Sequence, residues 1–87
     1  MYKLYYTKQA VKDAALLKAA NLDVKCQHML EELSKCPYTA HYEKLIGKLK
    51  GCCSRRINIK HRLVYKIYES EKAIKILRMW SHYEWYN

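Results

Sequence analysis

The chain has 87 residues, of which 17 are Lys or Arg and 8 are Asp or Glu, so its formal net charge is +9 at pH 7. A chain this short supports one thin hydrophobic core, which predicts a single domain over residues 1–87 and argues against a deep, enclosed active site. An apolar content of 51% is too high for a disordered basic tail, and no apolar run approaches the about 18 residues of a membrane helix. We therefore expect a folded, soluble, cytoplasmic protein with no membrane partner.

The pattern of the first 37 residues predicts a strand followed by two helices. Tyr2–Tyr6 is a Tyr-rich run typical of a strand, and Thr7 suits the N-cap of a helix whose apolar spacing continues to Lys18. Asn21 marks a break, and Pro37 closes the second helix. The apolar face of that second helix consists of Leu22, Cys26, Met29, Leu30 and Leu33.

After a predicted loop at Tyr38–Glu43, the hydrophobic pattern changes to a period of two residues. Three strands are predicted, at Cys52–Ile59, Arg62–Tyr68 and Ala73–Trp80, and a polar turn at residues 69–71 separates the last two. An N-terminal strand, two helices and then an antiparallel sheet make an α+β fold. We expect the helices to cover one face of the sheet and to leave the other face for a partner.

The positive charge is concentrated in the second half of the chain. Residues 1–43 hold 6 Lys against 5 acidic residues, whereas residues 44–87 hold 11 Lys plus Arg against 3. Such a stripe, interleaved with Tyr and His, is typical of a surface that binds a polyanion, here nucleic acid or ribosome, although a solvated sheet face kept soluble by Lys gives the same pattern. Between residues 44 and 68 it comprises Lys44, Lys48, Lys50, Arg55, Arg56, Lys60, Arg62 and Lys66, with no acidic residue among them.

The cysteines and histidines do not have the spacing of a metal site. The chain has 4 Cys and 4 His but no C-x-x-C and no H-x-x-x-H, so we expect neither a metal nor another cofactor. Cys26 is simply explained as a small core residue of the second helix. Cys52 and Cys53 are adjacent on a predicted strand and should point to opposite faces of the sheet.

Two residues at the border of the positive stripe are candidates for acid–base chemistry. Glu43 is an isolated carboxylate that can act as a base or form a salt bridge with Lys44, Lys48 or an Arg. His82 ends the last predicted strand, where it is either an exposed structural residue or a proton donor and acceptor at neutral pH.

Three blocks in the second half resemble a known family. HYEKLIGKLKG (residues 41–51), SRRINIKHRLVY (54–65) and ILRMWSHYE (76–84) resemble, in order and spacing, the YoeB/Txe branch of the RelE superfamily, the toxins of bacterial toxin-antitoxin pairs. The resemblance implies a microbial-RNase-like fold and an endoribonuclease that inhibits translation by cutting mRNA in the ribosomal A site. It also implies a neutralising antitoxin of the YefM/Phd type, and it leaves a homodimer open.

The same resemblance assigns roles to individual residues. Glu43 is expected to be the general base, Arg62 the cation that stabilises the phosphorane, and His82 the acid that protonates the leaving 5′-oxygen. Tyr83 is expected to position the RNA or to stack on a base. The expected RNA-binding residues are Lys48, Lys50, Arg55, Arg56, Lys60 and Lys66.

The chain also departs from the family pattern. Cys52 and Cys53 stand where relatives usually carry aromatics, Lys60 adds charge to the stripe, and residues 84–87 extend beyond the His-Tyr pair. Two other readings remain. One is a non-catalytic ParE-like toxin or a ribosome blocker of the same fold, and the other is a plain RNA-binding module.

Overall fold

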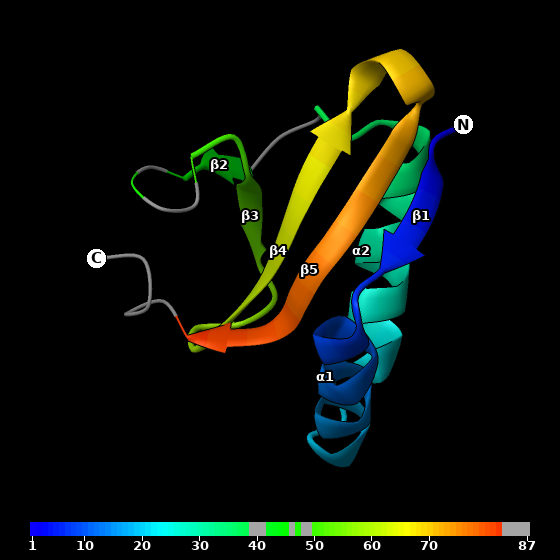
Figure 1. The fold of residues 1–87 in the computed structure, drawn as a ribbon. Coiled ribbons are helices and arrows are strands. Elements are labelled where there is room, and N and C mark those ends of the chain that lie inside the picture. The colour runs from blue at the N-terminus through cyan, green and yellow to red at the C-terminus, as the bar shows by residue number, and fades with distance from the viewer. Residues whose placement is uncertain (39–41, 46, 48–49, 83–87) are drawn as a thin grey trace.

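A computed structural model describes residues 1–38, 42–45, 47 and 50–82, apart from the side chains of residues 81 and 82. It confirms the α+β fold class, with a strand and two helices followed by the remaining strands (Figure 1). The elements are β1 (Lys3–Tyr6), α1 (Lys8–Ala19), α2 (Asp23–Lys35), β2 (Tyr42–Lys44), β3 (Cys53–Arg56), β4 (His61–Tyr68), the 3-10 turn η2 (Glu69–Glu71) and β5 (Ala73–His82).

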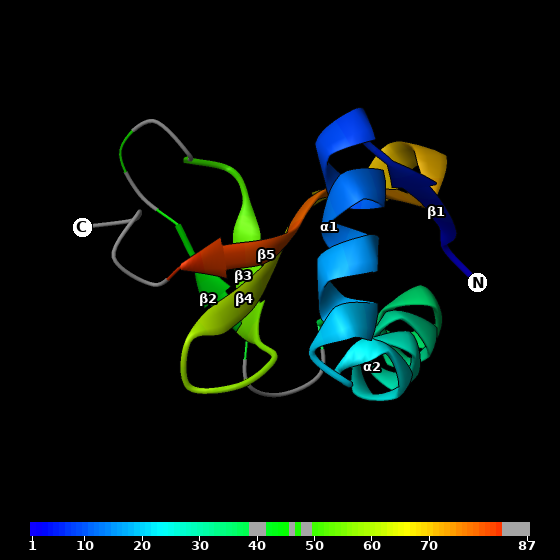
Figure 2. The same ribbon diagram turned by 90° about the horizontal axis from the view of Figure 1, so that it is seen from below.

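The five strands form one sheet in the order β1-β5-β4-β3-β2. Strands β3, β4 and β5 pair antiparallel in chain order, as expected. Strand β2 adds to β3, also antiparallel, whereas β1 pairs parallel with β5 and makes the sheet mixed. A parallel pair needs a long crossover connection, and here that connection includes both helices. Figures 1 and 2 show the two helices on the same side of the sheet, close to β1 and β5, while β2 and β3 lie away from them.

Local features explain the start of α1 and the break between the two helices. Thr7 caps α1 as predicted, because its Oγ1 accepts a hydrogen bond from the Ala10 N–H at 3.0 Å. The break at Asn21 is also confirmed: this residue has a φ of 59°, in the left-handed region that Asn tolerates better than most residues. Within the described ranges, no helix is long and apolar enough to cross a membrane.

Two strands differ from the sequence pattern. Tyr42–Lys44 forms the edge strand β2 at the end of a segment predicted as a loop, and β3 ends at Arg56 although the alternation continues to Ile59. The reason for the early end is Asn58, whose Oδ1 accepts hydrogen bonds from the N–H groups of Lys60 and of His61, the first residue of β4, at 2.9 and 2.7 Å. Ile59 is consequently 83% exposed in this turn.

The hydrophobic core lies between the helices and the sheet, and a second small cluster lies on the other side of the sheet. Cys26 belongs to the core as predicted, and the adjacent Cys53 and Cys52 belong to the core and to the second cluster, respectively. We call the uncovered side of the sheet the open face. From strand alternation and register, it carries Lys3, Tyr5, Glu43, Ser54, Arg56, Arg62, Val64, Lys66, Tyr68, Ala73 and Lys75.

Candidate active site

Glu43 of β2 and Arg62 of β4 meet on the open face of the sheet. The Arg62 Nη1 lies 3.2 Å from the Glu43 Oε1 and also donates a hydrogen bond to the Ser54 Oγ at 3.2 Å. The sequence allowed an ion pair of Glu43 with Lys44, Lys48 or an Arg, and in the structure the partner is Arg62. These three residues come from three neighbouring strands, β2, β3 and β4.

The register of the sheet explains why these residues meet. Glu43 is directly opposite Ser54, whereas Arg62 is opposite Arg56, two residues further along β3. Arg62 therefore reaches Glu43 along a diagonal, a distance that a long side chain can span. The diagonal passes over Ser54, which is fully buried and small enough to lie beneath the guanidinium.

The two charged groups differ in their exposure to solvent. Arg62 is only 2% exposed as a residue, whereas the side chain of Glu43 is 59% exposed. A buried guanidinium held by a carboxylate and a hydroxyl has little freedom to move, so it presents its positive charge at a fixed point. The exposed carboxylate remains accessible to a ligand that approaches the open face, and the pair can supply a base and an immobile cation.

The other two predicted catalytic residues are only partly covered by the structure. His82 is the last residue of β5, and its backbone is opposite His61 at the start of β4. Its neighbour Ser81 is opposite Arg62, so the backbone of β5 runs beside the Glu43–Arg62 pair at this end of the sheet. The side chain of His82 and the whole of Tyr83 lie outside the described residues.

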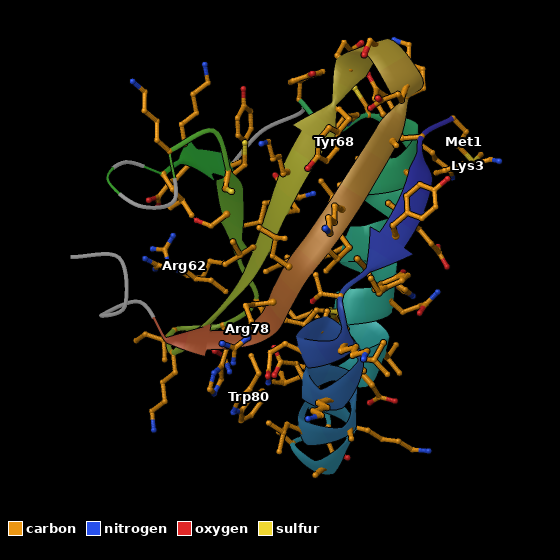
Figure 3. The ribbon with its side chains drawn as sticks, viewed as in Figure 1. Met1, Lys3, Arg62, Tyr68, Arg78 and Trp80 are labelled. Atoms are coloured by element: carbon orange, nitrogen blue, oxygen red, sulfur yellow. The ribbon has the colours of Figure 1, made fainter. Side chains whose placement is uncertain are left out.

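The strand that leads to His82 is held by aromatic stacking. The Trp80 and His61 rings stack with their centroids 3.6 Å apart and their planes at 19°. Because these residues belong to β5 and β4, the stack joins the two strands close to the candidate site. Figure 3 shows Trp80 and Arg78 at the lower end of the sheet, below Arg62.

The predicted RNA-binding residues fall into two groups. Arg56 and Lys66 lie on the open face, with Arg56 directly opposite Arg62. Arg55 points to the other side of the sheet, where its Nη2 lies 3.2 Å from the Glu32 Oε2 of α2, and the structure therefore does not bring it to the Glu43–Arg62 pair. Lys60 lies in the turn between β3 and β4, Lys50 lies in the turn before β3, and Lys48 is outside the described residues.

A buried carboxylate in α1 was not found from the sequence. Asp13 is fully buried, and its Oδ2 accepts hydrogen bonds from the Arg78 Nε at 2.8 Å and from the Met79 and Trp80 N–H groups at 3.0 and 3.2 Å. Burial by itself raises the pKa of the Asp13 carboxyl, but the hydrogen bonds from Arg78 and Met79 outweigh burial and lower this pKa below its usual value.

Asp13 acts on an irregular part of β5. The pairing of β4 with β5 shifts register on both sides of Val64, so that Met79 and Trp80 together face one residue of β4. Such a bulge removes backbone N–H groups from the regular ladder, and Asp13 accepts hydrogen bonds from two of them. The only signal in the sequence is an acidic residue among the small and apolar residues of α1, which a solvent-exposed position explains equally well.

The structure gives no indication of a metal centre in the part of the chain that it describes. No group of three His, Cys, Asp or Glu side chains there is arranged to hold an ion. The four cysteines, all within the described ranges, form no disulfide with one another, and Cys36 is the exposed one.

Comparisons with known proteins agree on one family. The family model described as the YoeB-like toxin of the bacterial type II toxin-antitoxin system matches residues 6–83. Among solved structures, the chain is similar to the YoeB/ParE toxin from Agrobacterium tumefaciens, with 26% sequence identity and a TM-score of 0.83 over 93% of this chain and 99% of that chain. No curated protein sequence matches the chain.

The chain is also similar to two other solved structures, one of a toxin in complex with its antitoxin and one of a more distant relative. A chain of the YoeB-YefM complex from Staphylococcus aureus has 30% identity and a TM-score of 0.78 over 95% of this chain and 99% of that chain. YafQ from E. coli, at 20% identity and a TM-score of 0.79 over the whole of both chains, shows the shared fold alone. The matched segment 6–83 contains the Glu43–Arg62 pair and His82.

Proposed function

The chain belongs to the YoeB-like toxins of bacterial type II toxin-antitoxin systems, and on this basis we propose that it is a metal-independent endoribonuclease that cleaves mRNA on the ribosome. The observation that carries the proposal is the Glu43–Arg62 pair on the open face, in which an accessible carboxylate lies 3.2 Å from a buried guanidinium. Cleavage of RNA through its own 2′-hydroxyl needs a base, a cation and an acid, and this pair supplies the first two.

The proposed reaction starts at Glu43. Its carboxylate takes the proton of the 2′-OH, and the freed oxygen attacks the neighbouring phosphorus. Arg62 stabilises the negative charge that develops on the phosphorane oxygens, because its guanidinium is held in place before the substrate arrives. The bond to the 5′-oxygen then breaks, and His82 gives that oxygen a proton. The products are a 2′,3′-cyclic phosphate and a 5′-hydroxyl, and Tyr83 positions the RNA.

The proposed partners follow from the family and from the charge. Messenger RNA and ribosomal RNA are polyanions, and the half of the chain that forms β2 to β5 carries most of the +9 charge. A YefM/Phd-type antitoxin is proposed as the neutralising partner, since a relative with 30% identity has been solved in a complex with YefM. The Staphylococcus aureus YoeB has also been solved as a dimer, and we leave a homodimer of this chain open.

The test is mRNA cleavage on translating ribosomes by Glu43→Gln, Arg62→Ala and His82→Ala. Loss of a general acid or base typically costs about 10²- to 10⁴-fold in rate, and we expect each variant to fall within or beyond this range. Glu31→Gln and His28→Ala, on the exposed surface of α2, are matched controls that should cleave like the wild type.

Two results would contradict the proposal. One is cleavage at the wild-type rate by all three site variants. The other is growth arrest by the wild-type chain with mRNA left intact and DNA damaged, which would favour a ParE-like toxin. Because Arg62 is buried, its variant must be compared with the wild type by circular dichroism before the rates are interpreted.

A further inference from the structure

A hollow lies on the open face at the end of β4 that is remote from the Glu43–Arg62 pair. Tyr5 of β1 is directly opposite Lys75 of β5, and Tyr68 of β4 is directly opposite Ala73 of β5. The two Tyr side chains thus flank β5 from its two neighbouring strands, and the small side chain of Ala73 leaves space between them. The resulting cavity has a volume of about 490 Å³ and is lined by Tyr5, Tyr68, Glu71, Ala73 and Lys75, which we call the tyrosine hollow.

Two lysines at the tyrosine hollow repel each other electrostatically, and a bound anion would relieve this repulsion. Lys66 and Lys75 are directly opposite each other on β4 and β5, and like charges in this position destabilise a sheet. Within the described ranges, neither ammonium has an acidic partner within ion-pair distance. Instead, the Lys66 Nζ lies 5.3 Å from the centroid of the Tyr68 ring. A phosphate between the two ammonium groups would remove the repulsion.

The tyrosine hollow offers what a nucleotide base requires. The Tyr5 side chain is exposed and the Tyr68 side chain is half-buried, so both rings have surface available for stacking. The carboxylate of Glu71 at the rim can accept a hydrogen bond from an exocyclic amino group of a base.

We propose that the tyrosine hollow binds a base of single-stranded RNA while Lys66 and Lys75 hold an adjacent phosphate, as a second contact for the strand that reaches the Glu43–Arg62 pair. This inference rests on the proposed function, because it assumes that RNA follows the open face. Arg62 and Tyr68 are six residues apart on β4, which is about 20 Å at the rise of a strand. A stacked strand at about 3.4 Å per nucleotide covers that distance with about six nucleotides. Figure 3 shows Tyr68 and Arg62 towards opposite ends of the sheet.

Binding of short RNAs by the full chain tests the tyrosine hollow. The parent protein is Glu43→Gln, which should leave bound RNA uncut, and the probes are fluorescent single-stranded RNAs of about 4 and about 12 nucleotides in an anisotropy titration. Stacking on one aromatic ring contributes enough that we expect Tyr5→Ala to weaken binding of the longer RNA roughly tenfold. Lys75→Gln should weaken it less, whereas the affinity for the shorter RNA should change much less in both variants.

Matched controls separate stacking from a general loss of charge or structure. Tyr5→Phe keeps the ring and should bind like the parent. Tyr6→Ala changes the next residue of β1, which points to the other side of the sheet, and Lys25→Gln removes a charge from the exposed surface of α2. Both should retain the parent affinity for the longer RNA.

The inference is overturned if Tyr5→Ala and Lys75→Gln bind the longer RNA as tightly as the parent. It is also overturned if a polyglutamate peptide of about 12 residues binds to the parent through Tyr5 and Lys75 while RNA does not, because the tyrosine hollow would then suit an acidic protein segment. Cleavage by the wild-type chain is measured separately. If the wild-type chain does not cleave mRNA but Tyr5→Ala still weakens binding of the longer RNA, the proposed function is wrong and the tyrosine hollow remains an RNA contact.

Discussion

At the scale of single residues, the candidate site combines an exposed carboxylate with a buried guanidinium. Glu43 is exposed, whereas Arg62 is buried, and the same Arg62 nitrogen forms an ion pair with Glu43 and donates a hydrogen bond to Ser54. Ser54 touches no substrate in the proposed mechanism, so its role is to position the guanidinium. A group that is oriented before the reaction contributes more to stabilising the transition state than one that must reorient.

The change Ser54→Ala tests this positioning role. It removes the oxygen that accepts the Arg62 hydrogen bond, and bonds to charged groups contribute about 1.5 to 3 kcal/mol. We expect the cleavage rate at saturating substrate to fall about tenfold with little change in KM, because Arg62 keeps its charge but loses one of the groups that orient it. Ser70→Ala, in the exposed η2 turn, is the control. A rise in KM alone, or no change, would argue against the positioning role.

The sequence singled out Glu43 and Arg62 individually, but it could not predict how they meet. Glu43 falls in a strand of three residues, which is too short for alternation to be visible, and this strand is what places it opposite Ser54. Ser54 itself looks like a spacer before two arginines. A count of charges could not show that Arg55 pairs with Glu32 of α2 and lies away from the Glu43–Arg62 pair.

At the scale of elements, β5 is the strand on which the site depends most. It pairs with both β1 and β4, it contains two register irregularities, and it ends at His82. The carboxylate of Asp13 fixes the irregular part from α1 through Arg78 and two backbone N–H groups. Alternation predicted the strand but not the bulges, since these depend on a partner in a distant helix. The parallel pairing with β1 is equally non-local.

Replacing Asp13 should destabilise the fold. In Asp13→Asn the side chain keeps one acceptor but loses its charge, which removes the ion pair between Asp13 and the partly buried Arg78 guanidinium. We expect a loss of about 2 to 4 kcal/mol in the free energy of unfolding, measured by urea denaturation near pH 7. Asp23→Asn, at the exposed start of α2, should lose much less. A loss below about 1 kcal/mol for Asp13→Asn would contradict this account.

The same carboxylate predicts a dependence of stability on pH. Because the pKa of Asp13 is lower in the folded chain than in the unfolded chain, its stabilising contribution is present above about pH 4 and is lost as the pH falls through the folded pKa. Hydrogen bonds from Lys72, Tyr2 and Tyr38 also lower the pKa of Glu69, to about 2, so Glu69 acts in the same direction. The wild type and Asp13→Asn share the contribution of Glu69, so it cancels when the two are compared. Below pH 4 the wild type should therefore lose more of its free energy of unfolding than Asp13→Asn does. Parallel curves would show that Asp13 does not titrate in this way.

At the scale of the whole molecule, the excess positive charge lies in the sheet and its turns and not in the helices. The helices hold a nearly balanced set of charges, whereas the strands β2 to β5 and their turns hold most of the net +9. Of the cations in these strands, Arg56, Arg62, Lys66 and Lys75 lie on the open face with Glu43, whereas Arg55 and Arg78 pair with acidic residues of the helices. The sequence predicted this asymmetry well, because a charge count needs no knowledge of contacts, but it could not predict which cations share one face.

Salt dependence distinguishes the cations of the open face from those of the helices. Each phosphate contact on a single strand adds about 0.7 to the slope of log affinity against log salt concentration. We expect Arg56→Gln to reduce the slope for RNA binding by about this amount, whereas Lys12→Gln on α1 should leave it unchanged. Equal effects of the two substitutions would indicate that the whole molecule attracts RNA without a defined surface.

The most direct test of the proposed chemistry is the structure of the RNA ends that the wild-type chain produces on translating ribosomes. Attack by the 2′-oxygen, with Glu43 as base, requires a 2′,3′-cyclic phosphate or its hydrolysis product on the upstream fragment and a 5′-hydroxyl on the downstream fragment. Mass spectrometry of the fragments should show these ends, and their amount should fall by at least about 100-fold with Glu43→Gln but not with Glu31→Gln. A 5′-phosphate on the downstream fragment, or cleavage independent of Glu43, would contradict the account.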